Sequence, residues 1–196
     1  DSIKVWNPGT SGYASYFLYD DVTGYYPEYD GKWIKSGEAT PTADTLAAGT
    51  AFWLLRQAGA NTNLTTAGEV PSAAQYQFPI TKGKYNMIAN PYPTDLAING
   101  THFVIDVSNA VKGTGTSNAD TLSVWNPGTS GYADYFLYND ESGYNPDWDG
   151  KWLDNSDPNA GPTTATLGPG TPFWLLRQGG ADTNLTTAGE VPSAAQ

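Results

Sequence analysis

The nine residues Val-Trp-Asn-Pro-Gly-Thr-Ser-Gly-Tyr at positions 5–13 occur again, without change, at positions 124–132. The similarity extends to both sides, because residues 1–34 and residues 120–153 are identical at 23 of 34 positions. Similarity within one chain at a fixed spacing is the sequence signature of a repeat architecture. The fold is therefore expected to be set by one unit that is used twice.

A second repeated stretch marks the end of the unit. The run Asn-Leu-Thr-Thr-Ala-Gly-Glu-Val-Pro-Ser-Ala-Ala-Gln is found at residues 63–75 and again at residues 184–196. The chain starts and ends at the same phase of the repeat, which fits either a piece of a longer array or a protomer that borrows a segment from a neighbour. The predicted parts are a first copy, an intervening segment and a second copy, at residues 1–75, 76–119 and 120–196.

The predicted secondary structure consists of short strands. Runs of β-branched and aromatic residues are separated by clusters of Asn, Asp, Pro and Gly that form turns. We predict an all-β chain with two homologous sandwich-like or small-barrel repeat units, joined by an intervening β segment. The expected strands are Ser2–Trp6, Tyr13–Tyr19, Lys32–Lys35, Ala51–Gln57 and Asn63–Ala67 in the first copy, and Tyr85–Ala89 and Thr101–Val107 in the intervening segment.

The charge of the chain limits its partners. The 20 Asp and Glu residues outnumber the 9 Lys and Arg residues and give a formal net charge of -11. Nucleic acids and anionic membrane surfaces attract basic patches, so neither is expected as a partner. No stretch of about 18 apolar residues occurs, so no membrane insertion is expected.

Enzymatic chemistry finds little support in the sequence. The chain has no Cys and a single His, His102, and it contains no Gly-x-Ser-x-Gly motif for a nucleophilic serine. Paired carboxylates could serve glycoside hydrolysis, but Asp20 of the first copy is replaced by Asn139 in the second. We therefore expect a protein without catalytic activity.

Acidic loops occur at corresponding places in the two copies. Calcium binds in oxygen-rich loops of this kind, and no other cofactor is expected. The alternative is that the Asp residues form turns and keep the surface soluble, since neither loop has the Asp-x-Asp-x-Asp-Gly calcium pattern. The candidate calcium ligands are Asp20, Asp21, Asp30, Asp140, Asp147 and Asp149.

The same loops are rich in aromatic residues. A flat, exposed ring beside carboxylates can stack on a sugar and hydrogen-bond its hydroxyl groups, so glycans are candidate ligands. The alternative is that the rings form the small core of each unit, because small β units need large side chains to bury enough surface. The candidate carbohydrate-binding residues are Tyr25, Tyr29, Trp33, Tyr144, Trp148 and Trp152.

Other residues of each copy are assigned from their local sequence. Three Asn residues fit the glycosylation acceptor pattern, although a chain rich in Asn and Thr contains such triplets by chance. Four Trp residues lie in apolar strands with identical neighbours in both copies, and we expect them to be buried anchors. The glycosylation candidates are Asn63, Asn99 and Asn184, and the expected anchors are Trp6, Trp53, Trp125 and Trp174.

The intervening segment contains Gly-Lys-Tyr-Asn-Met-Ile-Ala-Asn-Pro-Tyr-Pro at residues 83–93. This stretch resembles the Gly-Tyr-Asn-Leu-Ile-x-Asn-Pro-Tyr-Pro segment of tandem β-rich repeat modules in large secreted bacterial surface proteins. The Trp6-Asn7 opening, the Phe52-Trp53 strand and residues 67–71 are similar to other parts of such modules. The resemblance implies an extracellular, β-rich part of a cell-surface protein, and it carries no known catalytic residues.

Near-identical copies multiply an interaction or a length, which favours a structural or adhesive role. We expect a non-enzymatic extracellular protein that self-associates head to tail into filaments; the alternative is a carbohydrate-binding module with one aromatic-lined site per copy. Consecutive elements usually pack together. The intervening segment is therefore expected to cover the first copy, and the second copy is expected to offer the corresponding surface to a neighbouring chain.

Overall fold

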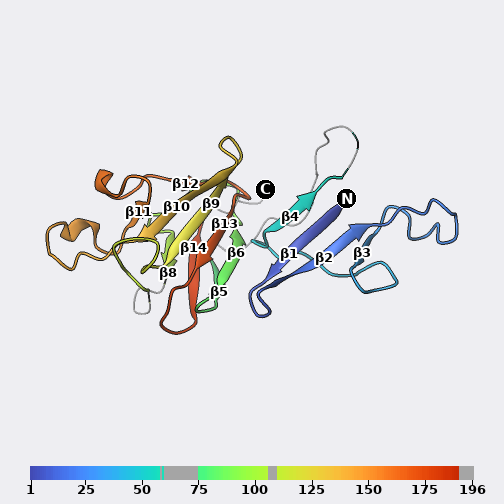
Figure 1. The fold of residues 1–196 in the computed structure, drawn as a ribbon, viewed down its shortest axis with the longest axis horizontal. Helices are drawn as coiled ribbons and strands as arrows, with labels where there is room; N and C mark the ends of the chain where they lie inside the picture. Colours follow the sequence, from blue (N-terminus) through green and yellow to red (C-terminus); the bar gives the residue numbers. More distant parts are fainter. Residues whose placement is uncertain (58, 60–74, 106–109, 190–196) are drawn as a thin grey trace, which may run out of the picture.

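The structure, a computed structural model, describes residues 1–57, 59, 75–105 and 110–189. Its strands form four antiparallel sheets (Figure 1), and none of the sheets in the described part closes on itself. The all-β prediction is confirmed. The expected strand Asn63–Ala67 lies outside the described residues.

No helix among the described residues has the length and apolar character needed to cross a membrane.

The first copy forms a four-stranded sheet in the order β3-β2-β1-β4. Its β1–β2 hairpin turns at Asn7, whose Oδ1 accepts a hydrogen bond of 2.9 Å from the backbone N–H of Gly9. Ser11 completes the turn with a φ of 50°, and Ser130 of the second copy adopts a φ of 51°. The same five-residue turn sequence therefore gives the same backbone in both copies. The strands are β1 (Ser2–Asn7), β2 (Gly12–Leu18), β3 (Trp33–Lys35) and β4 (Phe52–Leu55).

The second copy forms the corresponding strands in the same order, and one further strand extends its sheet to β11-β10-β9-β13-β6. The register also corresponds, because Ser2 pairs with Phe17 in the first sheet and Thr121 pairs with Phe136 in the second. The elements are β9 (Thr121–Asn126), β10 (Gly131–Leu137), β11 (Trp152–Asp154), β13 (Pro172–Leu176) and β6 (Tyr85–Ala89), with two 3-10 helices in the loops, η1 (Pro146–Trp148) and η2 (Pro158–Ala160).

A second layer of strands packs on one face of the five-stranded sheet. It consists of a three-stranded sheet, β5-β14-β8, and a two-stranded sheet, β12-β7. Leu122 and Leu175 of the five-stranded sheet and Leu185 of the second layer are fully buried in the hydrophobic core between them. The covering strands are β5 (Gln75–Ile80), β7 (Leu96–Ala97), β8 (Phe103–Ile105), β12 (Thr166–Leu167) and β14 (Thr183–Ala188).

The strands of the intervening segment pair with strands of the second copy, and the segment touches the first copy only at its edge. β6 pairs with β13, β7 pairs with β12, and both β5 and β8 pair with β14. The expectation that this segment covers the first copy is therefore wrong. The physical reason is that its apolar side chains, such as Ile80, Phe103 and Ile105, are buried in a core with the strands that follow it.

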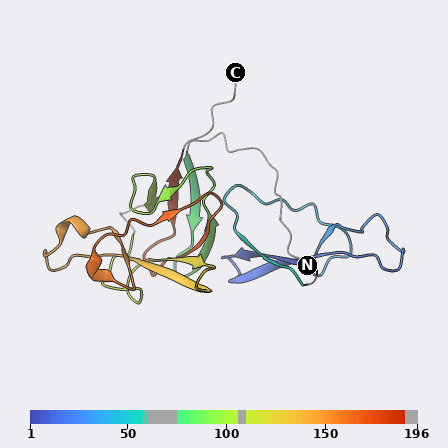
Figure 2. The same cartoon turned by 90° about the horizontal axis from the view of Figure 1, so that it is seen from above.

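The two sheets lie side by side and give an elongated molecule (Figure 1). Seen from above, the half that contains the second copy has two layers of strands, whereas the described strands of the first copy lie in one (Figure 2). The loops at residues 20–31 and 139–150 lie at opposite ends of the long axis. The first copy therefore presents a sheet face that corresponds to the covered face of the second copy.

Candidate functional site

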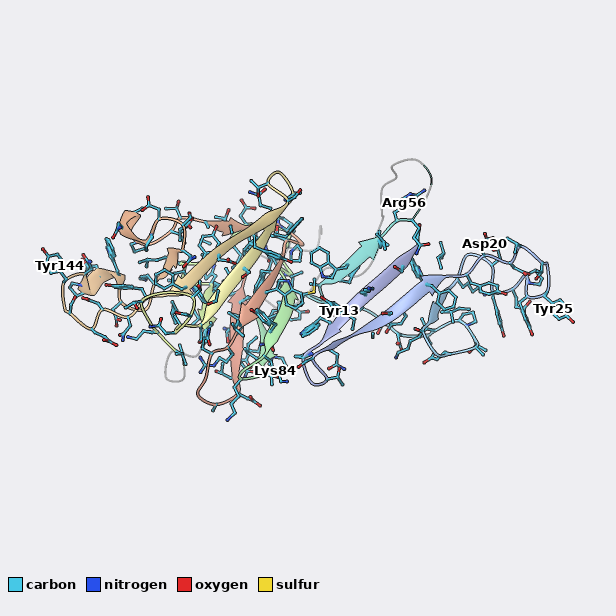
Figure 3. All side chains as sticks on the ribbon, in the orientation of Figure 1. Tyr13, Asp20, Tyr25, Arg56, Lys84 and Tyr144 are labelled. Carbon is cyan, nitrogen blue, oxygen red and sulfur yellow. The ribbon has the colours of Figure 1, made fainter. Side chains whose placement is uncertain are left out.

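The two acidic, aromatic loops are far apart, as the labels of Asp20, Tyr25 and Tyr144 show in Figure 3. Each loop follows the second strand of its sheet, β2 in the first copy and β10 in the second. Any binding site that a loop forms is therefore independent of the other loop.

The carboxylate of Asp21 organises the first loop. Its Oδ2 accepts a hydrogen bond of 2.8 Å from the backbone N–H of Tyr26. Its Oδ1 accepts hydrogen bonds from the N–H of Tyr25 (3.1 Å) and the hydroxyl of Thr23 (3.0 Å). Partial desolvation acts to raise the pKa of Asp21, but these hydrogen bonds outweigh it and hold the pKa below its ordinary value of 3.8. The N–H of Asp21 in turn donates to Oδ1 of Asp30 at 3.1 Å.

The second loop repeats this network. Asp140 Oδ2 accepts a hydrogen bond of 2.9 Å from the N–H of Asn145, and its Oδ1 accepts one of 2.9 Å from the hydroxyl of Ser142. The N–H of Asp140 donates to Asp149 Oδ1 at 3.1 Å. Lys112 Nζ lies 2.5 Å from Asp149 Oδ2, and this hydrogen bond is the main reason that the pKa of Asp149 is lowered.

The acidic side chains do not converge on a cation position. Asp21, Asp30, Asp140 and Asp149 accept hydrogen bonds from the donors of their own loops, while Asp20 is exposed. Asp147 is exposed as well. Within the described residues, no group of three or more His, Cys, Asp or Glu side chains could hold a metal ion. The geometry favours the turn-forming interpretation of these residues over calcium binding.

The aromatic residues of the loops separate into exposed and buried ones. Tyr25 and Tyr144 are strongly exposed, and Tyr26 is stacked on Tyr29 with ring centroids 5.3 Å apart and an interplanar angle of 9°. Trp152, in contrast, is buried in the hydrophobic core and cannot stack on a sugar at the surface.

The other two Trp residues of this candidate set have intermediate exposure. Trp148 contacts Tyr138 at a centroid distance of 6.3 Å. Trp33 corresponds in sequence to Trp152, yet it remains partly exposed because no second layer of described strands covers its sheet. Tyr25 and Tyr144 are therefore the exposed part of the predicted carbohydrate surface, and Tyr29 has intermediate exposure.

The glycosylation candidates differ in their surroundings. Asn99 is a structural clamp, because its Nδ2 donates to the carbonyls of Trp152 and Thr163 (both 2.9 Å) and its Oδ1 accepts from the N–H of Trp152 at 2.7 Å. A glycan on this amide would displace these hydrogen bonds. Asn184 is exposed on β14, and Asn63 lies outside the described residues.

The junction between the two sheets is lined with aromatic rings. Trp6 meets Trp174 with ring centroids 5.3 Å apart, and Trp53 meets Trp125 at 6.3 Å. Trp6 corresponds to Trp125, and Trp53 corresponds to Trp174. Each contact therefore joins the same two positions of the repeat, one from each copy, as at a two-fold interface. The expected core anchors thus have intermediate exposure and join the two copies instead of filling a core.

Exposed tyrosines widen this junction into a cleft of about 420 Å³. Tyr13, Tyr85 and Tyr132 line it together with Asp134, and Trp6 Nε1 donates a hydrogen bond of 2.6 Å to the carbonyl of Tyr85. Sequence reasoning missed this site because it depends on how the sheets pack, and Trp6 was expected in a core instead.

The motif at residues 83–93 joins the intervening segment to the second copy through buried side-chain hydrogen bonds. Buried Asn86 donates from Nδ2 to the carbonyl of Leu175 at 3.2 Å, and buried Asn90 donates to the carbonyl of Leu167 at 2.9 Å. Buried Tyr92 donates its hydroxyl hydrogen to the carbonyl of Thr187 at 2.9 Å. The polar residues of the motif thus satisfy backbone carbonyls that the core would otherwise bury without partners.

Corresponding side chains of the two copies differ sharply in exposure. Several core residues of the second copy are buried, whereas their counterparts in the first copy are partly in solvent. Four such pairs are Phe17 at 41% against Phe136 at 1%, Leu18 at 36% against Leu137 at 4%, Leu46 at 48% against Leu167 at 1%, and Leu54 at 41% against Leu175 at 0%.

Comparison of the chain with protein-family models, with curated proteins and with solved structures finds no match. His102, the residue on which a catalytic triad would depend, is exposed and contributes its backbone carbonyl to a 2.9 Å hydrogen bond from the N–H of Ala188.

Proposed function

We propose that this protein is a non-enzymatic extracellular structural or adhesive repeat protein of the bacterial cell-surface type, built from two homologous sandwich-like units. The observation that carries the proposal is the exposed apolar face of the first sheet. A contiguous apolar face on a protein surface marks a contact with another protein or segment. A repeat that presents such a face at one end is suited to extending an assembly rather than to turning over a substrate.

The side of the first sheet that carries Ile3, Leu18, Phe52 and Leu54, here called the open face, gives the chain a surface for self-association. Leu18 and Leu54 lie on this face and would leave water when a second molecule covers it. Two such faces that meet each other close a two-fold dimer, whereas a head-to-tail arrangement pairs this face with a different surface of the next molecule.

Sedimentation velocity over a range of concentrations tests this proposal. The weight-average mass of the parent chain should rise with concentration, and Leu54→Asp should suppress the rise. Leu55→Asp is the matched control, because Leu55 is the next residue of β4 and is exposed on the opposite face. A parent that stays monomeric at high concentration, or equal behaviour of the two variants, contradicts the proposal.

Carbohydrate binding is a second candidate, and the exposed rings of Tyr25 and Tyr144 favour it. The backbone N–H of each tyrosine donates to the carboxylate of its loop, Asp21 or Asp140, so the exposed ring is carried by an ordered, polar loop on which a sugar could stack. Tyrosine NMR signals should shift on addition of a bacterial or plant polysaccharide, and Tyr25→Ala with Tyr144→Ala should remove the response. Unchanged spectra across a panel of polysaccharides would exclude this function.

A further inference from the structure

We propose that the open face of the first sheet is a docking site for a segment with the sequence pattern of residues 75–119, placed ahead of Asp1 as Ala119 is placed ahead of Asp120. The inference rests on the proposed repeat function and names the partner that fits this face. It also defines the structural unit: an intervening segment followed by a copy, rather than a copy followed by a segment.

The second copy shows what covers a face of this kind. Leu122, Phe173 and Leu175 pack against the intervening segment, and the first copy has Ile3, Phe52 and Leu54 at the same positions. Phe and Leu are unchanged at two of these positions, and the third has Ile3 where the second copy has Leu122. A segment that seats on the second sheet therefore meets a surface of nearly the same shape on the first.

The edge strand of the first sheet, β4, also corresponds to a strand that pairs with the intervening segment in the second copy. β13 pairs with β6 over five residue pairs, from Pro172 with Ala89 to Leu176 with Tyr85. Its counterpart β4 is the last strand of the first sheet in the described part of the chain. Such an edge exposes backbone N–H and C=O groups that a further strand can pair with.

The contact that now touches this edge is small. A single bridge joins Thr50 to Ile88, and the N–H of Ala89 donates to the carbonyl of Gly49 at 2.8 Å. A docked segment would replace this bridge with a ladder like that of β6 on β13. The exchange gains backbone hydrogen bonds, and it buries the side chains that are now exposed.

An ion pair in each copy points to the same occupant. Arg177 and Asp120 form a completely buried pair, and the intervening segment contributes a hydrogen bond of 3.0 Å from the N–H of Val111 to Asp120 Oδ2. Arg56 and Asp1 are the same pair in the first copy, 3.5 Å apart, with 40% and 25% of their side-chain surfaces exposed. The first copy thus has the charge pair that this segment covers in the second.

A second molecule of the chain cannot supply the occupant by exchange. Its own residues 75–119 already cover its second copy, so giving them away would uncover one face for each face that is covered. The occupant must be a copy of the segment that is not already engaged. The end of the chain to which a free copy of the segment is added should therefore decide whether it covers the first sheet of its own molecule or that of another.

The test adds one copy of residues 75–119 to the full chain at either end. With the segment ahead of Asp1, we expect a monomer in which the amide hydrogens of residues 2–18 exchange at least about tenfold more slowly than in the parent, approaching the rates of residues 121–137. With the same segment after Gln196, no copy follows it within the chain, so it should reach the first sheet of another molecule and give concentration-dependent, head-to-tail oligomers. The two fusions have the same composition and serve as matched controls.

A third fusion isolates the seating of the segment. It carries Ile80→Asp and Phe103→Asp only in the added copy ahead of Asp1, so the parent part of the molecule is unchanged. Protection of residues 2–18 should then fall back to the parental rate. Protection that is absent from the unmodified fusion ahead of Asp1, or that appears equally in a monomeric fusion after Gln196, overturns the inference.

These outcomes are separable from those of the proposed function. A parent chain that is monomeric at all concentrations contradicts self-association, yet the fusion ahead of Asp1 can still protect the first sheet. If the parent self-associates but residues 2–18 are not protected in the fusion ahead of Asp1, the face binds another molecule and this segment is not its partner.

Discussion

Removing the charge of Arg177 should destabilise the protein far more than removing the same charge from Arg56. In Arg177→Met, the carboxylate of Asp120 stays completely buried and loses its only cationic partner among the described residues. Leaving one member of a buried ion pair without its partner costs about 3–5 kcal/mol. Two backbone donors, the N–H groups of Val111 and Gln178, still reach Asp120. We therefore expect the free energy of unfolding to fall by about 3 kcal/mol, at the lower end of that range.

Arg56→Met is the matched control, because it removes the same residue type from the same place in the other copy. Its pair with Asp1 is partly in solvent, and exposed ion pairs contribute about 0.2–1 kcal/mol. The assay is urea unfolding of the full chain, with hydrogen exchange at β9 and β13 to assign the loss to the second copy. Equal losses for the two variants, or an Arg177→Met protein as stable as the parent, would refute the reasoning.

Three further changes test other parts of the structure. Leu175→Ala should cost about 3–5 kcal/mol of unfolding free energy by calorimetry, because it opens a cavity in the core, and Leu54→Ala should cost less than about half of that. Asn86→Ala should cost about 1–3 kcal/mol, measured by urea unfolding, since the N–H of Thr81 then lacks its acceptor; an unchanged midpoint would contradict this role of Asn86. An NMR titration should place the pKa of Asp21 below 3.8. A lowered pKa in the folded loop stabilises it above the unfolded value, and this contribution should vanish as pH falls through the folded pKa, so a value at or above 3.8 would contradict the network.

Four strands of the first copy, β1 to β4, could be predicted to within about two residues because the turns between them are local. Asn7, Gly9 and Ser11 form their hairpin turn with contacts inside five residues, so a pattern of neighbours predicts it. The acidic loops are equally local: Asp21 binds donors at most five residues away. These features could be predicted as turns, and the structure places them in that role.

The pairing of the intervening segment could not be predicted from neighbouring residues. Asn86 and Asn90 contact Leu175 and Leu167, more than 70 residues away in the chain, and proximity in sequence favoured the first copy instead. The aromatic junction fails for a similar reason. Trp6 is an apolar residue in an apolar strand, and whether such a ring fills a core or joins two sheets depends on which face of its sheet is covered.

Hydrogen exchange of the unmodified full chain, resolved by mass spectrometry, measures whether the first sheet lacks the covering layer that the second sheet has. The peptides covering residues 2–18 and 121–137 have corresponding strands and register, so they differ mainly in the layer that covers one of them. The account predicts that residues 121–137 exchange at least about tenfold more slowly, because they open only when the two-layered core opens. Equal protection of the two segments would show that the first sheet is covered as well and would contradict the account.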